Sequence, residues 1–378
     1  MGGKELRCSP ENERAGTGAA AHGVDSGVHG IVTVRTAGAD SCYVRRVPFS
    51  QILGQDAAIA TLKSALTRGR VHHAYRFEGP DGTGKEMAAF ALAQALVCTG
   101  GDVFGCGQCD ACRRAVTISD APPHVPIHPD VTLVEKGLYP PETIGKKDTE
   151  KSDISIHQIR TIVLSHASYP PHEGRARVYI IRRAEELNPS AANALLKTLE
   201  EPRQGTHFIL LTARADRLLN TIRSRSLPVR FGPLPDEVLR GILRGKGVPE
   251  ERQDLSIDLS AGSASLALEL CDEERTAARD AFVSSVLNAV DARDLGPAVT
   301  LSESGDKDKG ALRDDLRALA AVLARRARQD VGAAPRAALV AARRYEVVAR
   351  AVTSLERNAS PGLTMISLVQ EMRAATGF

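Results

Sequence analysis

A glycine-rich segment at residues 77–86, FEGPDGTGKE, constrains the fold of this chain more than any other stretch. It follows the phosphate-binding loop pattern G-x-x-x-x-G-K-[ST] at every position except the last. Such a loop lies between a strand and a helix, and suitable apolar runs occur at 74–78 and 87–97. The segment therefore predicts the strand–loop–helix unit of an α/β nucleotide-binding fold. The residues that would hold a nucleotide's phosphates are Gly79, Gly82, Gly84 and Lys85.

Two departures affect the chemistry of this predicted site. Glu86 occupies the position where a serine or threonine would hold Mg²⁺, and a carboxylate there would repel the nucleotide's phosphates. A hydrolysing site also requires acidic residues after a buried strand, but the apolar run 178–181 is followed by Arg182 and Arg183. Arginine keeps its proton in proteins, so it cannot bind the metal. We treat these as two independent lesions and expect a degenerate site without ATP turnover, while ATP binding itself stays doubtful.

A cysteine cluster follows the predicted helix, in the segment VCTGGDVFGCGQCDACRR at 97–114. Its four thiolates can complete a tetrahedral zinc site with no open coordination position, so we expect a structural rather than a catalytic zinc. An iron–sulfur cluster is the competing interpretation. Four clustered cysteines among seven also fit a reducing compartment better than a disulfide framework. The predicted ligands are Cys98, Cys106, Cys109 and Cys112.

Bulk properties narrow the classes of function. The net charge of +3 and the pI of about 8.5 allow nucleic-acid contact without requiring it. Aromatic residues make up 4% of the chain and tryptophan is absent, which weighs against a base-stacking platform as the main activity. No apolar run reaches the roughly 18 residues of a membrane span, and the first residues lack a hydrophobic signal core. We therefore expect a cytoplasmic protein without a membrane partner.

The order of the patterns predicts three folded regions. Apolar runs alternate with helical patterns up to residue 233, which indicates a parallel sheet flanked by helices. Beyond it the chain contains only helical patterns. We expect a disordered extension at 1–46, a phosphate-binding-loop domain with the four-cysteine insertion at 47–233, a small helical domain at 234–272 and an all-helical domain at 273–378.

Four further features of residues 49–233 belong together. They are FSQILGQ at 49–55, the phosphate-binding loop with the cysteine insertion behind it, LNPSAANALLKTLEEP at 187–202 and TIRSRS at 221–226. With these motifs the region resembles the bacterial clamp-loader branch of the AAA+ ATPases. Within that branch it is similar to the delta-prime group of the DNA polymerase III clamp loader, which shares its fold with gamma/tau but does not turn over ATP.

The resemblance implies a role for Arg225. In this family the arginine of a Ser-Arg-Cys motif reaches into the ATP site of the neighbouring subunit, and such an arginine supplied in trans can be worth about 10³–10⁵ in rate. Here Ser226 replaces the family's cysteine. The position where ATPase members carry a nucleotide-sensing arginine corresponds to Leu266. Without the resemblance, Arg225 would be interpreted as a solvated arginine in a helix–strand turn.

The resemblance also implies partners and architecture. It implies an AAA+ domain, a helical lid and a helical collar, in a hetero-oligomeric ring with gamma/tau and delta subunits that loads the sliding clamp at primed DNA. The chain would have no activity of its own but would belong to a DNA-directed DNA polymerase holoenzyme. Two alternatives stay open: an active gamma/tau-like ATPase that uses Glu185 for magnesium, and a zinc-containing DNA-binding adaptor. The adaptor predicts tight, salt-dependent DNA binding by the chain alone.

Overall fold

A computed structural model shows how these patterns fold. It describes residues 47–145, 153–173, 175–292, 294, 296–304, 309–357 and 359–375. The predicted extension at 1–46 lies outside these ranges. Within the ranges that are described, no helix has both the length and the apolar character needed to cross a bilayer.

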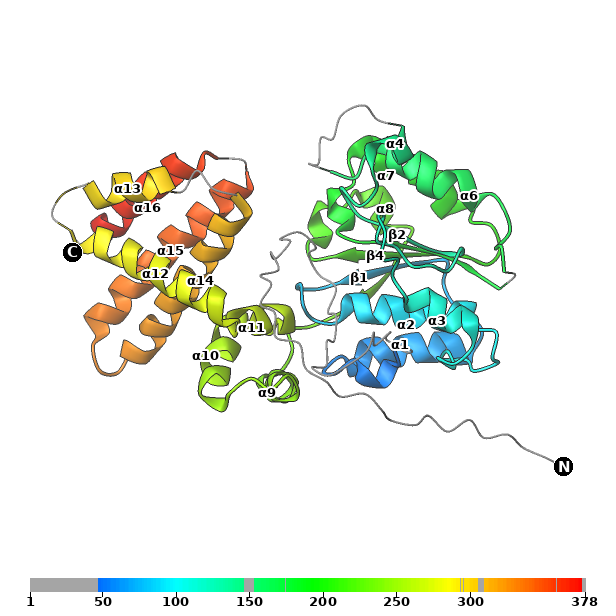
Figure 1. The fold of residues 1–378 in the computed structure, drawn as a ribbon, viewed down its shortest axis with the longest axis horizontal. Helices are drawn as coiled ribbons and strands as arrows, with labels where there is room; N and C mark the ends of the chain where they lie inside the picture. The colour runs from blue at the N-terminus through cyan, green and yellow to red at the C-terminus, as the bar shows by residue number, and fades with distance from the viewer. Residues whose placement is uncertain are drawn as a thin grey trace, which may run out of the picture. The chain divides into compact units, whose positions relative to one another are not determined.

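A parallel sheet organises the first folded region (Figure 1). In the described residues it has five strands in the order β2-β3-β4-β1-β5, and every neighbouring pair is parallel. Because β1 lies between β4 and β5, the loop after β1 opens near the middle of the carboxyl edge, where open α/β sheets bind ligands. The strands are β1 (Ala74–Glu78), β2 (Val131–Val134), β3 (Arg177–Ile181), β4 (Thr206–Thr212) and β5 (Leu227–Arg230).

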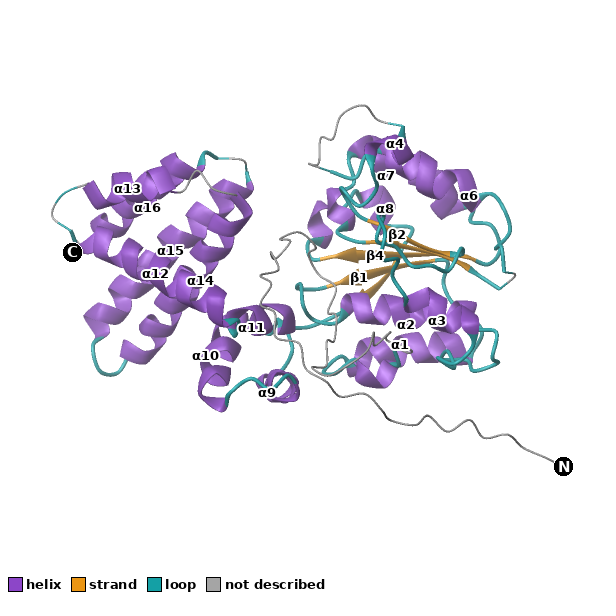
Figure 2. Ribbon diagram, in the orientation of Figure 1, coloured by secondary structure: helices purple, strands orange, loops and turns teal. Residues whose placement is uncertain are grey.

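Helices cover both faces of the sheet (Figures 1 and 2). Successive strand residues point to opposite faces, so Val178 and Ile180 of β3 join one apolar cluster while Tyr179 and Ile181 join the other. The helices on the first face are α1 (Asp56–Thr67), α2 (Lys85–Val97) and α3 (Asp110–Val116). The second face carries α5 (Ile156–Gln158), the π-helix η2 (Ile159–Leu164), α6 (Ser165–Ala167) and α7 (Pro189–Glu200).

The expected strand–loop–helix unit is present as β1, the glycine-rich loop and α2. Helix α2 is buried along most of its length, because it is apolar on every side and lies against the sheet. The helix predicted after Asn188 also forms, since the Asn188 side chain accepts a hydrogen bond from the backbone N–H of Ala191 at 2.8 Å. The parallel sheet flanked by helices is thus confirmed.

Some elements escaped the sequence patterns. Strand β5 contains Pro228 and exposes three of its four residues, so it carries no apolar run. It forms as an edge strand, the position in a sheet that tolerates proline. Helix α13 begins at a Gly-Pro pair and is rich in Ser and Thr, which masks its helical pattern. Short elements in the first region are η1 (Phe49–Gln51), α4 (Pro141–Ile144), η3 (Ala184–Glu186), η4 (Ala215–Arg217) and α8 (Asn220–Arg223).

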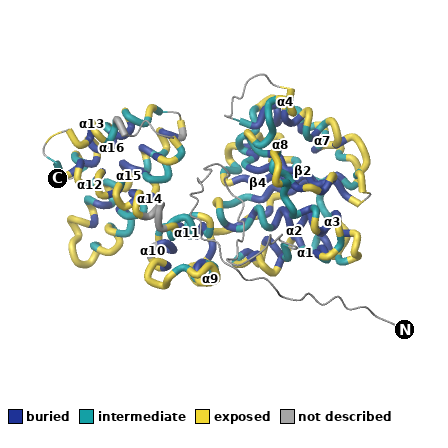
Figure 3. The backbone as a smooth tube through the Cα atoms, in the orientation of Figure 1, coloured by how far each residue is buried: buried dark blue, intermediate teal, exposed yellow. Residues whose placement is uncertain are grey.

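The rest of the described chain is helical, and it contains apolar clusters distinct from those of the sheet (Figure 3). One cluster joins α9 (Asp236–Gly245), α10 (Glu250–Ser260) and α11 (Ala264–Leu270). The other joins α12 (Glu273–Asp291), α13 (Gly296–Ser304), α14 (Lys309–Asp330), α15 (Pro335–Glu356) and α16 (Pro361–Ala374). These clusters fall within the predicted ranges 234–272 and 273–378, whose boundaries stay predictions.

A buried acid fixes the connection into β2. Asp130 is 1% exposed and accepts hydrogen bonds from the backbone N–H groups of His172 and Glu173, at 2.6 and 2.7 Å. It also pairs with the guanidinium of Arg177, at 3.0 Å from Nη2. Burial alone would raise the pKa of Asp130, but these donors hold the pKa below its ordinary value of 3.8.

Replacing this acid should destabilise the sheet domain in a pH-dependent way. Asp130→Asn leaves Arg177 buried without its counter-charge, which should lower the free energy of unfolding by about 3–5 kcal/mol at pH 7. A depressed folded-state pKa gives stability that is present above the unfolded pKa and is lost as the pH falls below it. Urea unfolding of both proteins between pH 3 and 7 should therefore show the difference shrinking below about pH 4. The exposed Asp120→Asn is the control, and an equal loss in both variants would contradict the assignment.

Candidate functional site

The glycines predicted to cradle phosphates shape a tight loop between β1 and α2. Gly82 and Gly84 have φ angles of +74° and +91°, which favour glycine because a Cβ atom would clash there. At Gly79 an added Cβ would lie 2.0 Å from the carbonyl oxygen of Phe231. The structure thus brings Gly79, Gly82, Gly84 and Lys85 together as the sequence predicts.

Lys85 is turned onto its own loop. Its side chain is 7% exposed, and Nζ donates hydrogen bonds to the carbonyl oxygens of Gly79 and Pro80, at 2.5 and 2.6 Å. Nζ also lies 3.6 Å from a carboxylate oxygen of Asp81. Burial lowers the pKa of Lys85, and the negative charges of Asp81 and Glu185 oppose that shift. An ammonium group has three hydrogen-bond donors. The loop carbonyls already occupy two of them, which leaves one for a phosphate.

The residues that depart from the ATPase pattern contact each other. Arg182 follows β3, is 8% exposed at its side chain and pairs through Nη2 with the Glu86 carboxylate in the first turn of α2. Its Nη1 donates to Glu135, directly after β2, at 2.9 Å. Burial lowers the pKa of Arg182 less than the two carboxylates raise it, so its net pKa lies above the ordinary value. Burial also raises the pKa of Glu86, with Arg182 acting against it.

This contact corrects the expectation that the two lesions are independent. A carboxylate at the serine/threonine position and a guanidinium at the acidic position form one buried ion pair, because the parallel sheet places the ends of β2 and β3 beside the start of α2. Glu135 was not predicted. Its signal in the sequence is an acidic residue directly after the apolar run 131–134.

Helix α11 closes over the tip of the loop. The carbonyl oxygen of Gly82 accepts a hydrogen bond from the backbone N–H of Ala264 at 3.0 Å. A Cβ at Gly82 would lie 2.3 Å from the hydroxyl oxygens of both Ser263 and Ser265. The α11 sequence, ASLALEL, contains no basic residue, and Leu266 lies in its first turn. The first turn of α11 thus offers hydroxyl and apolar groups to the loop, whereas the resemblance places a nucleotide-sensing arginine of the ATPase members at the position of Leu266.

In the alternative of an active ATPase, the carboxylate of Glu185 would bind the magnesium ion. One of its carboxylate oxygens accepts a hydrogen bond from the backbone N–H of Ala213 at 3.3 Å. The other is buried and has no hydrogen-bond partner among the described residues. Its charge raises the pKa of Lys85, which indicates that it faces the loop. Glu185 is therefore the observation that keeps this alternative open.

Removing the internal ion pair should open the site to a metal–nucleotide complex. In Glu86→Thr combined with Arg182→Asp, a hydroxyl and a carboxylate replace the pair, and these are the oxygen ligands that Mg²⁺ prefers. Titration calorimetry with MgATP should show binding at least about tenfold tighter than in the unmodified chain. Glu86→Thr alone keeps Arg182 in place and serves as the matched control. Equal affinities in all three proteins would show that the pair does not close the site.

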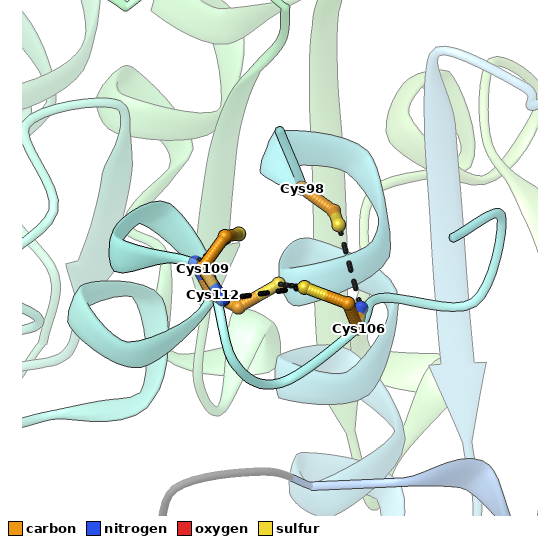
Figure 4. Close-up of side chains that lie close together, drawn as sticks. All are labelled: Cys98, Cys106, Cys109 and Cys112. Carbon is orange, nitrogen blue, oxygen red and sulfur yellow. Dashed lines mark hydrogen bonds between the residues drawn. The ribbon is translucent and has the colours of Figure 1, made fainter. Parts of the chain in front are cut away.

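The four predicted zinc ligands converge (Figure 4). Their sulfur atoms all lie within 4.8 Å of one another, and none of these cysteines is in a disulfide. The Sγ atoms of Cys106 and Cys112 are 3.9 Å apart. Two thiolates of a tetrahedral zinc site with Zn–S bonds of about 2.3 Å lie roughly 3.8 Å apart. Cys98 comes from the end of α2, Cys106 and Cys109 from the following loop, and Cys112 from α3.

Backbone N–H groups point at these sulfur atoms, which favours thiolates. The N–H of Cys106 lies 3.4 Å from the Sγ of Cys98, and the N–H of Cys109 lies 3.3 Å from the Sγ of Cys106. Burial raises the pKa of Cys109, but hydrogen bonds from Thr99 and Cys112 outweigh it and lower the pKa to about 5. This donor set fits zinc held by four thiolates, a structural rather than a catalytic arrangement.

The cysteine cluster is joined to the phosphate-binding-loop helix. Gln94 of α2 is fully buried and donates a hydrogen bond through Nε2 to the carbonyl oxygen of Cys112, at 2.9 Å. Ala111 and Ala115 of α3 belong to the same apolar cluster as α2. A metal bound by the cysteines would therefore hold α3 against the helix that begins at the loop.

Loss of one thiolate should release the metal and loosen this contact. Cys109→Ser should bind less than one tenth of the zinc that the unmodified chain binds, because zinc at a structural site requires all four ligands. The zinc content of the purified protein, measured by elemental analysis, checks this. Cys271→Ser, outside the cluster, is the control and should keep its zinc. An absorption band of an iron–sulfur cluster in place of zinc would contradict the metal assignment.

Arg225 lies in the turn between α8 and β5, and its side chain is 33% exposed. Its Nη1 donates to the carbonyl oxygen of Thr221 at 3.0 Å and lies 3.1 Å from the hydroxyl of Ser224. Its Nη2 forms an ion pair with Glu200 at the end of α7. The predicted helix–strand turn is therefore present, with its arginine held in a surface ion pair.

Sheet topology separates Arg225 from the loop of its own chain. Arg225 precedes β5, whereas the phosphate-binding loop follows β1, and these two strands are parallel neighbours. The register pairs Tyr75 with Leu227, so the two sites lie at opposite edges of the sheet, about 20 Å apart at roughly 3.3 Å per strand residue. The side chain of Arg225 therefore cannot reach a nucleotide bound at the loop of its own chain.

The sheet order and the loop after β1, with helical regions following, define the first region as an AAA+ fold. Residues 54–235 match the family model described as DNA polymerase III, delta subunit. Over this region, which is slightly less than half of the chain, the sequence is similar to the DNA polymerase III delta/delta-prime family and to gamma/tau subunits.

Individual relatives are similar to parts of the chain. The delta-prime subunit of DNA polymerase III from Bacillus subtilis is 30% identical over 231 residues, covering 61% of this chain and 61% of the relative. The gamma/tau subunit from Mycobacterium tuberculosis is 32% identical over 247 residues, covering 64% of this chain and 39% of the relative. This chain thus spans less than two thirds of either relative. A solved gamma-subunit-related protein from Thermotoga maritima covers 85% of this chain at 17% identity, with a TM-score of 0.45.

Proposed function

We propose that this chain is a delta-prime-type subunit of a DNA polymerase III clamp loader. It hydrolyses no ATP itself and supplies Arg225 in trans to the ATP site of a neighbouring gamma/tau-type subunit. The observation that carries the first part is the buried pairing of Arg182 with Glu86 and Glu135, in the residues where an active site would hold Mg²⁺. A bound metal would face a guanidinium there.

The second part rests on where Arg225 lies. Arg225 is partly exposed and directly precedes β5, the outermost strand, at the amino ends of the strands. The phosphate-binding loop of its own chain lies at the carboxyl ends. A guanidinium that enters a partner's site can stabilise the charge that develops on the transferring phosphate. Arg225 would perform this chemistry without any change in its own chain's degenerate site.

Engagement of a partner requires Arg225 to leave Glu200, and this step costs little. Both side chains are partly exposed, at 33% and 47%, and exposed ion pairs contribute only about 0–1 kcal/mol. The negative charge of a neighbour's nucleotide is a stronger partner than one solvated carboxylate. The pair with Glu200 therefore holds the guanidinium near its place of action without trapping it.

The proposed assembly has the composition that the family suggests. It is a hetero-oligomeric ring with gamma/tau and delta subunits, which acts on the sliding clamp and primed DNA in replication. The helices from α12 to α16 would form its collar, and the thiolates of the cysteine cluster would hold a structural zinc. DNA contact would come through the assembled ring.

ATP hydrolysis in a reconstituted complex tests the role of Arg225. Arg225→Ala should leave assembly intact but lower clamp- and DNA-stimulated hydrolysis at the adjacent site by about 10³-fold or more, because the phosphoryl charge loses its guanidinium. The rate is measured with the gamma/tau subunit of the same organism, and complex formation is followed by size-exclusion chromatography. Arg223→Ala, in the same turn with an exposed side chain, is the matched control. Unchanged hydrolysis in an intact Arg225→Ala complex would make the chain a passive scaffold.

The same preparations distinguish the alternatives. ATP turnover by the isolated chain that disappears in Glu185→Gln would favour an active ATPase, in which the unpartnered oxygen of Glu185 binds the metal. Tight DNA binding by the isolated chain, weakening steeply with salt, would favour a DNA-binding adaptor. The proposed function predicts neither result.

A further inference from the structure

A buried arginine in the centre of the sheet requires an explanation. Arg76 is the middle residue of β1, is 6% exposed and lies between two other strands. Arginine is almost never buried to this extent unless its charge and its donors are satisfied. Its nearest acid is Glu78, whose Oε1 lies 2.5 Å from the Nε of Arg76. That pair balances the charge but leaves the rest of the guanidinium to find acceptors elsewhere.

Those acceptors belong to the turn that carries Arg225. The Nη1 of Arg76 donates to the carbonyl oxygen of Arg223 at 2.9 Å and to the hydroxyl oxygen of Ser226 at 2.8 Å. The carbonyl oxygen of Ser226 lies 3.4 Å from the same nitrogen. One buried guanidinium therefore holds the backbone two residues before Arg225 and one residue after it.

These contacts also account for the serine that departs from the family's Ser-Arg-Cys motif. Ser226 is 6% exposed, accepts from Arg76 and donates its hydroxyl hydrogen to the carbonyl oxygen of Ile222 at 2.8 Å. A hydroxyl is a good acceptor for a buried guanidinium, whereas a thiol is a weak one. The serine and the arginine thus form a matched pair that spans β1 and the turn.

We infer that Arg76, through Ser226, is a positioning residue for Arg225. The guanidinium fixes the turn to β1, the strand next to β5, so the partly exposed side chain of Arg225 starts from a backbone held on both sides by hydrogen bonds to a buried guanidinium. A displacement of a catalytic group by about 1 Å can lower the reaction rate by about 10²-fold. The inference rests on the proposed role of Arg225 and adds the residues that set its geometry.

Kinetics of the reconstituted complex test the inference with three variants of this chain. Arg76→Met removes the donors, Arg76→Met with Glu78→Gln also removes the charge of the acid that loses its buried partner, and Ser226→Ala removes only the hydroxyl. Each should lower the kcat of partner ATP hydrolysis by about tenfold to a hundredfold while leaving the KM for ATP and the assembly unchanged. Arg76→Lys, which keeps a charged donor, should recover part of the rate. Zinc content and the midpoint of thermal unfolding identify any variant that fails to fold. If the Arg76 variants do not fold, the kcat of the Ser226→Ala complex tests the inference.

A double-mutant cycle separates positioning from general stability. In an Arg225→Ala background, Ser226→Ala and Arg76→Met should cause no further loss of rate, because the group that they position is gone. An equal additional loss in that background would overturn the inference, as would an unchanged kcat in folded complexes. If Arg225→Ala alone has no effect, the proposed function itself fails, and that outcome is visible in the single variant.

Discussion

The buried ion pair between Arg182 and two carboxylates governs what this fold can do. Glu86, Arg182 and Glu135 come from α2, the end of β3 and the end of β2, so one guanidinium joins three elements at the carboxyl edge of the sheet. Breaking such a pair by removing one partner costs about 3–5 kcal/mol, because the remaining charge stays buried. The residues that depart from the ATPase pattern are therefore also part of what holds the loop region together.

A phosphate-binding loop that binds to itself still has a structural role. Lys85 ties the loop carbonyls, Gly82 contacts α11, and Gln94 joins α2 to the cysteine cluster. The loop and its helix thus act as a connector among the sheet, the cysteine cluster and the following helices.

In the proposed function, the acting group lies at the amino ends of the strands and not at their carboxyl ends. The carboxyl edge holds the closed loop, while the amino edge of β5 presents Arg225 on a turn fixed by Arg76 and Ser226. A buried arginine lies near each edge: Arg182 pairs with Glu86, at the serine/threonine position of the loop pattern, and Arg76 donates to Ser226, at the cysteine position of the Ser-Arg-Cys motif. This division suits a subunit that completes another subunit's site while its own stays shut.

The sequence by itself determined the α/β class, the loop, the capped helix after Asn188 and the four cysteines, because glycine spacing, capping and ligand spacing are local in the chain. It indicated strand β5 only as the strand of a helix–strand turn, because an edge strand with proline is exposed along most of its length and has no buried alternation. Only the tertiary structure decided that Glu86 and Arg182 pair, with Glu135 added. It also decided that Arg76 holds the turn of Arg225, since residues separated by 147 positions in sequence meet there. Sheet register sets these contacts, and no pattern along the chain encodes which strand ends become neighbours.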